Sequence, residues 1–278
     1  MAQFAVEDKG WLRTLLAHPE TWQQLPLEDV MIPMLENYKS ADPELRDELS
    51  FTLVASLMNA PQMTEQMVAR LVRRALDADH LFYRIGERGK DSVFMRSFSV
   101  LTIPLVMEWY EDRGSLSSEL FGDMVGAVER YALAEQDWRG YVASKGWAHG
   151  AAHLADALGA LGSWSGASEA QLDTILRLVH HVATLSTPLA HTEDDRLAMA
   201  VFQMLEAHPR CEAPFRRWLD GFQLKPSQND GEETIRGANA NHFLRALYYR
   251  FTQSAPQSDW LWPLLEALRR FDIYHQQS

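Results

Sequence analysis

Cysteine is almost absent from this chain of 278 residues, in which Cys211 is the only one. A single cysteine excludes an intramolecular disulfide and a zinc site built on several cysteines, so a metal would need histidine, aspartate or glutamate ligands. Long apolar runs are absent as well, since the longest, around "FSVLTIPLVMEWY", is too short to span a bilayer, which needs ~20 residues. The first residues, "MAQFAVEDKGW", lack the basic and apolar regions of a signal peptide. These absences predict a cytoplasmic protein.

Basic clusters are equally scarce, because the formal net charge is −12. The densest cluster, Arg70 with Arg73 and Arg74, is typical of the solvated face of a helix. Proteins that bind nucleic acid normally carry a basic patch, and anionic membrane surfaces attract basic segments. The sequence therefore predicts no binding to nucleic acid or membrane, and it leaves a small molecule or another protein as the partner.

Apolar residues recur at helical spacing along nearly the whole chain, and no alternating run bounded by turn residues predicts a strand. Helices of ~10–20 residues joined by short turns favour antiparallel neighbours. A fixed repeat length, the mark of a regular solenoid, is not found. We therefore predict an all-α fold of antiparallel helical hairpins, packed as an irregular α-solenoid or an α/α bundle with no sheet.

Two pairs of residues have the spacing of capping boxes, which mark the first turn of a helix. Ser168 pairs with Gln171, and Thr192 pairs with Asp195. Each pair precedes a run of apolar residues at helical spacing, so each predicts the start of a helix.

Two further stretches interrupt the helical pattern. Pro104 lies inside an apolar helix and predicts a kink that frees a carbonyl near Val100. The polar stretch 224–241, with Pro226 and two glycines, is predicted to be a loop, or a loop followed by the capped start of a helix. Such a loop is either a lid over a binding site or a plain surface connection.

The stretch "KGWAHGAAHLAD" holds two histidines four residues apart and an aspartate three further on. On a helical wheel drawn for 147–162, His149, His153 and Asp156 share one narrow face. A solvated helix face usually carries lysine, glutamate or arginine, and this segment has none. We therefore predict an internal helix whose polar side chains have partners, because a buried unpaired polar group costs ~1–3 kcal/mol.

The histidine face fits two interpretations. It either lines a polar pocket, in which one histidine is a general base or metal ligand and Asp156 orients His153, or it forms a structural hydrogen-bond network. The spacing suits two histidines on one zinc ion, but His149 and Asp156 are separated by ~10.5 Å of helical rise and can hardly share it. Candidates for a third ligand are Glu193, Asp194, His180, His181, His191 and His242. The acids among them are also explained by the positive end of a helix dipole.

Three cations lie near this face in the sequence or in the preceding helix. Arg139 and Lys145 are each followed by a glycine, and they could pair with Asp156 or hold an anionic substrate. Arg96 shares one face of an apolar helix with Ser99. If buried, Arg96 needs a partner, whereas at the surface it would extend its charged end into water.

Four segments occur in this order: "DSVFMRSFSVL", "EQDWRGYVASKGWAHGAAHLADALGAL", "EDDRLAMA" and "NHFLRALYY". Together they resemble the bacterial DUF2785 family, a domain of unknown function, over about Asp91 to Phe251. The resemblance implies an all-helical domain and carries no established reaction. It points to the positions already selected: Arg96, Arg139, Lys145, His149, His153, Asp156, Glu193 and Arg196.

The expected organisation is a single helical domain over 1–278, with N-terminal helices in 1–90, a family-like core in 91–253 and a C-terminal helix in 254–278. Two functional hypotheses remain open. One is an enzyme or small-molecule binder with His149, His153 and Asp156 as its catalytic group, in which a divalent metal such as zinc could be held by the two histidines. Its binding residues would be Arg96, Arg139, Lys145, Glu193 and Arg196. The alternative is a non-catalytic helical scaffold for protein–protein interaction.

Overall fold

The computed structural model describes residues 4–209, 212–223 and 231–271, and nearly all of their regular structure is helical. This confirms the predicted all-α class. The chain divides into two compact units, Met1–Ala157 and Leu158–Ser278, with the boundary inside one helix. No helix in the described part of the chain is long and apolar enough to cross a membrane.

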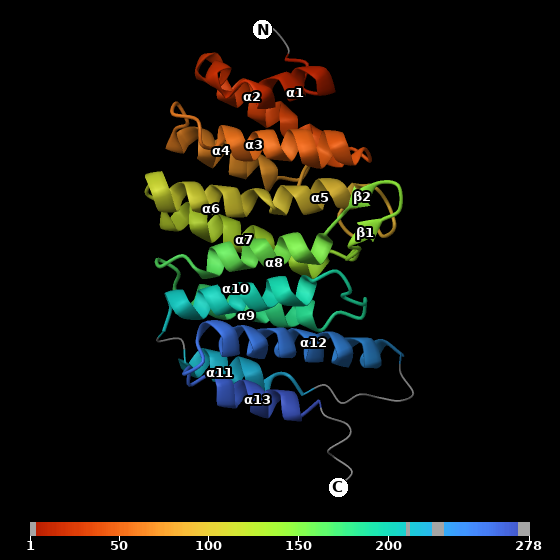
Figure 1. Ribbon diagram of the computed structural model, residues 1–278, viewed down its shortest axis with the longest axis vertical. Coiled ribbons are helices and arrows are strands. Elements are labelled where there is room, and N and C mark those ends of the chain that lie inside the picture. Colours follow the sequence, from red (N-terminus) through yellow and green to blue (C-terminus); the bar gives the residue numbers. More distant parts are fainter. Residues whose placement is uncertain (1–3, 210–211, 224–230, 272–278) are drawn as a thin grey trace. The chain divides into compact units, whose positions relative to one another are not determined.

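The first unit is built from helices that pack against their near neighbours in the sequence, such as α2 against α4 and α4 against α6 (Figure 1). It includes two 3-10 segments, η1 and η2, and one π-helical segment, η3. Its elements are α1 (Lys9–Ala17), η1 (Pro19–Gln24), α2 (Leu27–Met34), η2 (Leu35–Lys39), η3 (Glu44–Phe51), α3 (Thr52–Leu57), α4 (Glu65–Ala75), α5 (Ser92–Val100), α6 (Thr102–Arg113), α7 (Ser118–Ala134), β1 (Tyr141–Val142), β2 (Gly146–Trp147) and the first part of α8 (Gly150–Gly162).

The apolar helix that carries Pro104 is interrupted, as predicted. Proline has no amide hydrogen, and its ring clashes with the turn before it, so a straight helix cannot continue through it. The chain accordingly forms two helices, with α5 ending at Val100 and α6 starting at Thr102. Leu101 at the break still donates its amide to the Ser97 carbonyl at 3.3 Å.

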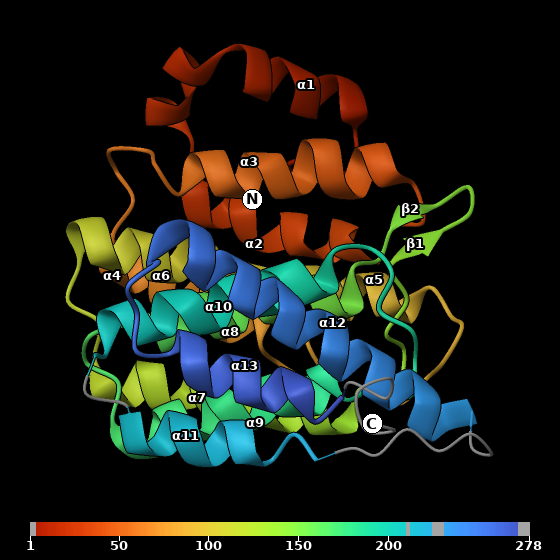
Figure 2. The same ribbon diagram turned by 60° about the horizontal axis from the view of Figure 1, so that its bottom comes forward.

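The sheet found among the described residues is a short hairpin of β1 and β2, in which Tyr141 lies opposite Trp147 and Val142 opposite Gly146. The prediction of no sheet differs from the structure at this point, because two-residue strands are too short to show an alternating pattern. Ser144 at φ 64° and Gly146 at φ 77° turn the chain between the strands. Figures 1 and 2 both show the hairpin at one end of α5.

Burial of α8 follows from its composition, and it confirms the predicted internal helix. Every residue of α8 is buried except Asp156 and Ala160, which are half-buried. The helix starts at Gly150 rather than at Trp147, so the wheel placed 147–149 wrongly on the helix. Gly150 is required here, because a Cβ on it would lie 2.9 Å from the carbonyl oxygen of Asp137.

The second unit also consists of helices, and its core includes a cluster of aromatic rings. Phe222 packs against Trp218 and Phe243 with ring centroids 5.0 and 5.8 Å apart. The elements are the end of α8, α9 (Glu169–Ala183), α10 (Glu193–Ala207), α11 (Glu212–Asp220), α12 (Gly231–Ser254) and α13 (Leu261–Arg269).

The two predicted capping boxes have different outcomes. At the start of α9, Ser168 and Gln171 form the reciprocal hydrogen bonds of a capping box, which confirms the prediction. At the start of α10, Thr192 makes no side-chain capping bond and has a left-handed backbone at φ 64°, so the second box is wrong. Glu193 instead accepts a hydrogen bond from the His191 amide at 2.6 Å.

The interpretation of 224–241 as a loop throughout is wrong, because 231–241 forms the start of α12, as the alternative with a helix start allowed. Residues 224–230 lie outside the described part. Glycine and asparagine are poor helix formers, and this composition suggested a loop. Tertiary contacts reverse that preference at Asn239, whose amide donates to the carbonyls of Leu185 and Thr187 at 2.9 and 2.8 Å. Its oxygen accepts from the Leu189 amide at 3.1 Å, so Asn239 fixes the connection between α9 and α10.

Candidate functional site

A buried arginine anchors the hairpin that leads into α8. Arg46, in η3, has no exposed surface, and its guanidinium donates to the carbonyls of Lys145 and Trp147 at 2.9 and 3.2 Å and to that of Ser40 at 2.7 Å. Its charged carbon lies 4.1 Å from the centre of the Phe94 ring, a cation–π contact. Burial lowers the pKa of Arg46 to about 10, so the group is charged at neutral pH.

Arg46 was not selected from the sequence as a buried residue, because the segment "DPELRDEL" has the composition of an exposed, charged helix start. Nothing in the local pattern marks one of its charges as buried. The available signal was indirect. A surface hairpin with exposed backbone carbonyls needs a donor from elsewhere in the chain, and arginine is the side chain best equipped to supply several.

The hydrogen bonds of His153 fix the position of its proton. Ser97 donates its hydroxyl to the carbonyl of Ala148, so its oxygen accepts from His153 Nδ1, which lies 2.8 Å away. Nδ1 also lies 3.2 Å from the Ser97 carbonyl oxygen. Both partners are acceptors, so Nδ1 carries a hydrogen.

This arrangement argues against Ser97 as an activated nucleophile. In serine hydrolases the histidine accepts the hydroxyl proton, whereas here the hydroxyl proton is directed at a backbone carbonyl. Ser99, which was noted in the sequence for sharing a helix face with Arg96, donates to the Met95 carbonyl of its own helix at 2.6 Å. Ser97, which was not selected, is the residue that faces the histidine.

His149 lies just before α8, not on it, and its backbone is left-handed at φ 52°. This conformation is strained for a residue with a side chain, and such strain is concentrated at functional sites. The imidazole is parallel to the indole of Trp147, with the ring centres 4.3 Å apart. The ring centres of His149 and His153 are 5.2 Å apart. The structure therefore brings the two histidines together, although by a route other than the helix spacing.

The hairpin also exposes two large aromatic side chains. Tyr141 is 53% exposed and Trp147 is 37% exposed, and their rings meet edge to face with centres 5.0 Å apart. We call the segment 140–149 the aromatic hairpin. Exposed tryptophan and tyrosine on a well-anchored backbone are typical of contact surfaces, because these residues dominate the energetics of interfaces.

Arg96 is completely buried and pairs with Glu135, a residue that the sequence analysis did not select. Its Nε and Nη2 donate to the two carboxylate oxygens at 2.5 and 2.9 Å, and Nη1 donates to the Tyr83 carbonyl and the Ser92 hydroxyl at 3.1 and 3.0 Å. Burial acts to lower the pKa of Arg96, but the hydrogen bonds and charge of Glu135 raise it above its ordinary value. The prediction that a buried Arg96 needs a partner is confirmed.

Arg139 and Lys145 have carboxylate partners of their own. Arg139 donates to both oxygens of Asp137 at 2.7 Å, and Lys145 donates to both oxygens of Asp91 at 2.7 Å. Neither of these partners is Asp156, the acid proposed for them from the sequence. An anionic ligand would have to compete with carboxylates that are already bound, so a binding role for the two cations stays a prediction.

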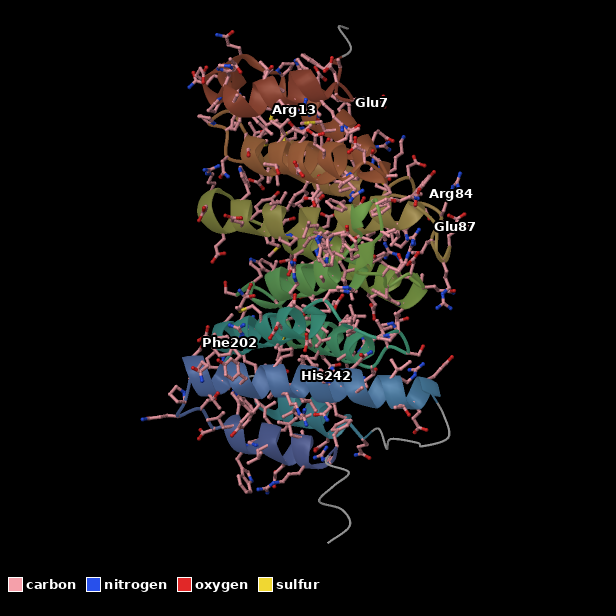
Figure 3. All side chains as sticks on the ribbon, turned by 45° about the vertical axis from the view of Figure 1, so that its right-hand side comes forward. Glu7, Arg13, Arg84, Glu87, Phe202 and His242 are labelled. Atoms are coloured by element: carbon pink, nitrogen blue, oxygen red, sulfur yellow. The ribbon has the colours of Figure 1, made fainter. Side chains whose placement is uncertain are left out.

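The remaining selected residues are divided between the two units. Asp156 is half-buried on α8, one turn after His153, and its role as the orienter of that histidine stays a prediction. Glu193 and Arg196 belong to the second unit, where Glu193 is buried at the start of α10 and Arg196 is half-buried in its first turn. In the same unit, His242 is exposed on α12 (Figure 3).

The arrangement of the acids and histidines that the structure describes gives little support for a metal centre. Within 4–209, 212–223 and 231–271, no group of three or more such side chains could hold a metal ion. The pair of histidines therefore remains a two-ligand site at most in the described residues. Two cavities of the first unit, of about 250 and 10 Å³, are lined by residues of other helices and not by His149 or His153.

Comparison with known proteins adds a family and no activity. No curated protein and no solved structure matches the chain. The family model described as "Protein of unknown function (DUF2785)" matches residues 81–249, which include α5, the aromatic hairpin, α8 and α10. The match covers more than half of the sequence, and it confirms the resemblance found in the sequence: the chain belongs to the DUF2785 family.

Proposed function

We propose that this protein is a non-catalytic binding protein and that the aromatic hairpin is its contact element. The observation that carries the proposal is the exposure of Tyr141 and Trp147 on a backbone held by the fully buried Arg46. Burying an arginine under a surface hairpin is costly, and the rigidity it brings lowers the entropy lost when the hairpin meets a partner. The proposal corresponds to the interaction scaffold expected as the alternative from the sequence.

The hydrogen bonds around the histidines support binding over hydrolysis. The Ser97 proton is directed at a carbonyl, and Arg139 and Lys145 are engaged by carboxylates at 2.7 Å. A catalytic site for an anionic substrate needs cations and a nucleophile that are free to meet the substrate. A cytoplasmic, bacterial setting for the binding protein remains the prediction made from the sequence.

Photo-crosslinking followed by affinity measurement tests the proposal. A benzoylphenylalanine at position 141 crosslinks the partner, which is then identified, purified and titrated calorimetrically against the unmodified protein. We expect Trp147→Ala to weaken the complex by about 2 kcal/mol or more, as for interface hot spots. Tyr249→Ala, which removes a tyrosine that is 65% exposed in the second unit, is the matched control and should leave the affinity unchanged. Equal affinities for the wild type and Trp147→Ala would refute the proposal.

A second candidate is a small-molecule or metal-assisted site at the two histidines, with Asp156 orienting His153. It is favoured by the strained backbone of His149 and by the short distance of 5.2 Å between the ring centres of His149 and His153. Titration of tag-free protein with zinc, alongside His149→Ala and His153→Ala, tests it. Stoichiometric binding that both variants lose would support this candidate, and binding that persists in both would exclude the pair.

A further inference from the structure

A loop clamped to the aromatic hairpin extends its surface. We call residues 84–91 the basic loop. Arg139 donates to the Lys90 carbonyl at 2.7 Å, and Asp137 accepts from the Gly89 amide at 2.7 Å. Lys145 on the hairpin binds the carboxylate of Asp91 at the end of the loop. Asp137 and Arg139 directly precede the hairpin, so the two segments lie side by side in the first unit.

The basic loop carries three exposed cations, two of which have no carboxylate partner among the residues that the structure describes. Arg84, Arg88 and Lys90 are all exposed, and Arg84 reaches Glu87 only at 3.9 Å. Arg88 and Lys90 have no carboxylate within 4 Å in the described part of the chain. Figure 3 shows Arg84 and Glu87 at one edge of the picture, and Glu87 also accepts a hydrogen bond from the Ser92 hydroxyl of α5 at 2.7 Å. In a protein with a net charge of −12, two cations without a carboxylate partner in the described ranges are a local exception, and they lie on a loop that is bonded to the hairpin with the two exposed aromatic rings.

The backbone of the basic loop has a defined and unusual shape. Three of its residues are left-handed: Arg84 at φ 48°, Gly86 at φ 89° and Gly89 at φ 68°. A Cβ on either glycine would meet no atom within 4 Å, so close packing does not explain them. The glycines are needed for the turns themselves. Hydrogen bonds to Asp137 and Arg139 hold the turn at Gly89, and Arg96 donates to the carbonyls of Arg84 and Glu87 around Gly86.

We propose that the basic loop and the aromatic hairpin together bind an acidic segment of a partner protein, one that carries apolar or aromatic side chains between its carboxylates. The inference rests on the proposed function and names the class of partner. Arg88 and Lys90 would form charge-assisted hydrogen bonds with the carboxylates, and Tyr141 and Trp147 would pack against the apolar groups. Opposite charges would also speed the encounter between the two proteins.

Charge favours an acidic peptide over a nucleic acid. The surface holds five cations against three carboxylates, namely Arg84, Arg88, Lys90, Arg139 and Lys145 against Glu87, Asp91 and Asp137. A protein that binds nucleic acid neutralises many phosphates, and the overall charge of −12 repels a long polyanion. A short acidic segment needs only the two unpaired cations.

Fluorescence anisotropy with a labelled decapeptide that alternates glutamate with tyrosine and leucine tests the inference. We expect binding that weakens as salt is added, and a loss of about tenfold or more in Arg88→Glu/Lys90→Glu, because two attractive contacts become repulsive. Arg73→Glu/Arg130→Glu is the matched control, since these arginines are exposed in the same unit and the change in net charge is identical. Circular dichroism confirms that each variant is folded.

The outcomes separate this inference from the proposed function. Equal losses in the two double variants, or no binding of the peptide at low salt, overturn the acidic partner. Tighter binding of a ten-nucleotide oligothymidylate overturns it in favour of nucleic acid. In each of these cases the proposed function still stands if Trp147→Ala weakens the crosslinked complex. If Trp147→Ala leaves that complex unchanged, the proposed function itself fails.

Discussion

Removal of Arg96 should destabilise the first unit strongly, because it leaves the carboxylate of Glu135 buried without a cation. Neither side chain of this pair is exposed to solvent. Breaking a buried ion pair by removing one partner typically costs about 3–5 kcal/mol. Total stabilities of domains are about 5–15 kcal/mol, so Arg96→Met should remain folded but with a large loss. Glu135→Gln should cost a similar amount, since it leaves the guanidinium buried with neutral acceptors only.

Urea denaturation followed by circular dichroism measures these losses. The control is Arg70→Met, which removes an arginine paired with Glu28 at 2.9 Å at the surface, where its side chain is 52% exposed. An exposed pair contributes about 0–1 kcal/mol, so this variant should be close to the wild type. The double variant Arg96→Met/Glu135→Gln should lose at least about 1 kcal/mol less than the sum of the single losses, because the two residues interact directly.

The competing hypothesis, predicted from the sequence, is that Arg96 binds a ligand, which would be anionic. In that case, Arg96→Met would lower ligand affinity and leave the stability nearly unchanged. A loss for Arg96→Met no larger than that for Arg70→Met would therefore refute the structural role argued from the hydrogen bonds to Glu135.

Three further predictions concern other parts of the chain. Burial acts to raise the pKa of Asp77, but its hydrogen bond with His80 lowers the pKa below its ordinary value. The ionised Asp77 therefore stabilises the fold above its unfolded pKa, and this stabilisation is lost as the pH falls through the folded pKa. Between pH 7 and pH 3, Asp77→Asn should therefore lose less stability than the wild type in thermal melts. Asn239→Ala should cost about 1–3 kcal/mol in urea titrations, because it leaves buried backbone groups without partners. Gly146→Ala should lower the melting temperature more than Gly89→Ala does. Both glycines have positive φ, but only at Gly146 would a Cβ meet another side chain, at 2.9 Å. Equal shifts in melting temperature would contradict this reasoning.

The features predicted correctly from the sequence depend on local chemistry. The helical class, the break at Pro104 and the capping box of Ser168 each follow from the spacing or backbone geometry of residues within one or two turns. The burial of α8 was predicted from the residues that it lacks. The failures at Thr192 and at 231–241 have the opposite cause, since there the backbone conformation or a tertiary contact overrode the local preference.

The candidate site was predicted only in part, because its partners come from distant segments. Arg46 binds the Lys145 carbonyl across 99 residues of sequence, and Ser97 binds His153 across 56. Charges such as Arg46 and Glu135 lie in stretches whose composition is typical of an exposed surface, so one sequence gives no reason to place them inside. Arg96, Arg139 and Lys145 were selected from the sequence as binding residues, which stays a prediction, and their carboxylate partners were not foreseen.

The pairing of these cations changes how the histidine segment is interpreted. A site that acts on an anion would leave a nearby cation available, whereas Arg139 and Lys145 serve to hold the aromatic hairpin and the basic loop together. Backbone carbonyls of the same hairpin also accept hydrogen bonds, at Lys145 from the Arg46 guanidinium and at Ala148 from the Ser97 hydroxyl. These contacts fix the backbone shape of the short hairpin, and none of them prepares a side chain for a reaction. Tyr141 and Trp147 are the large aromatic side chains that this segment exposes, and a partner would therefore gain most from contact with them.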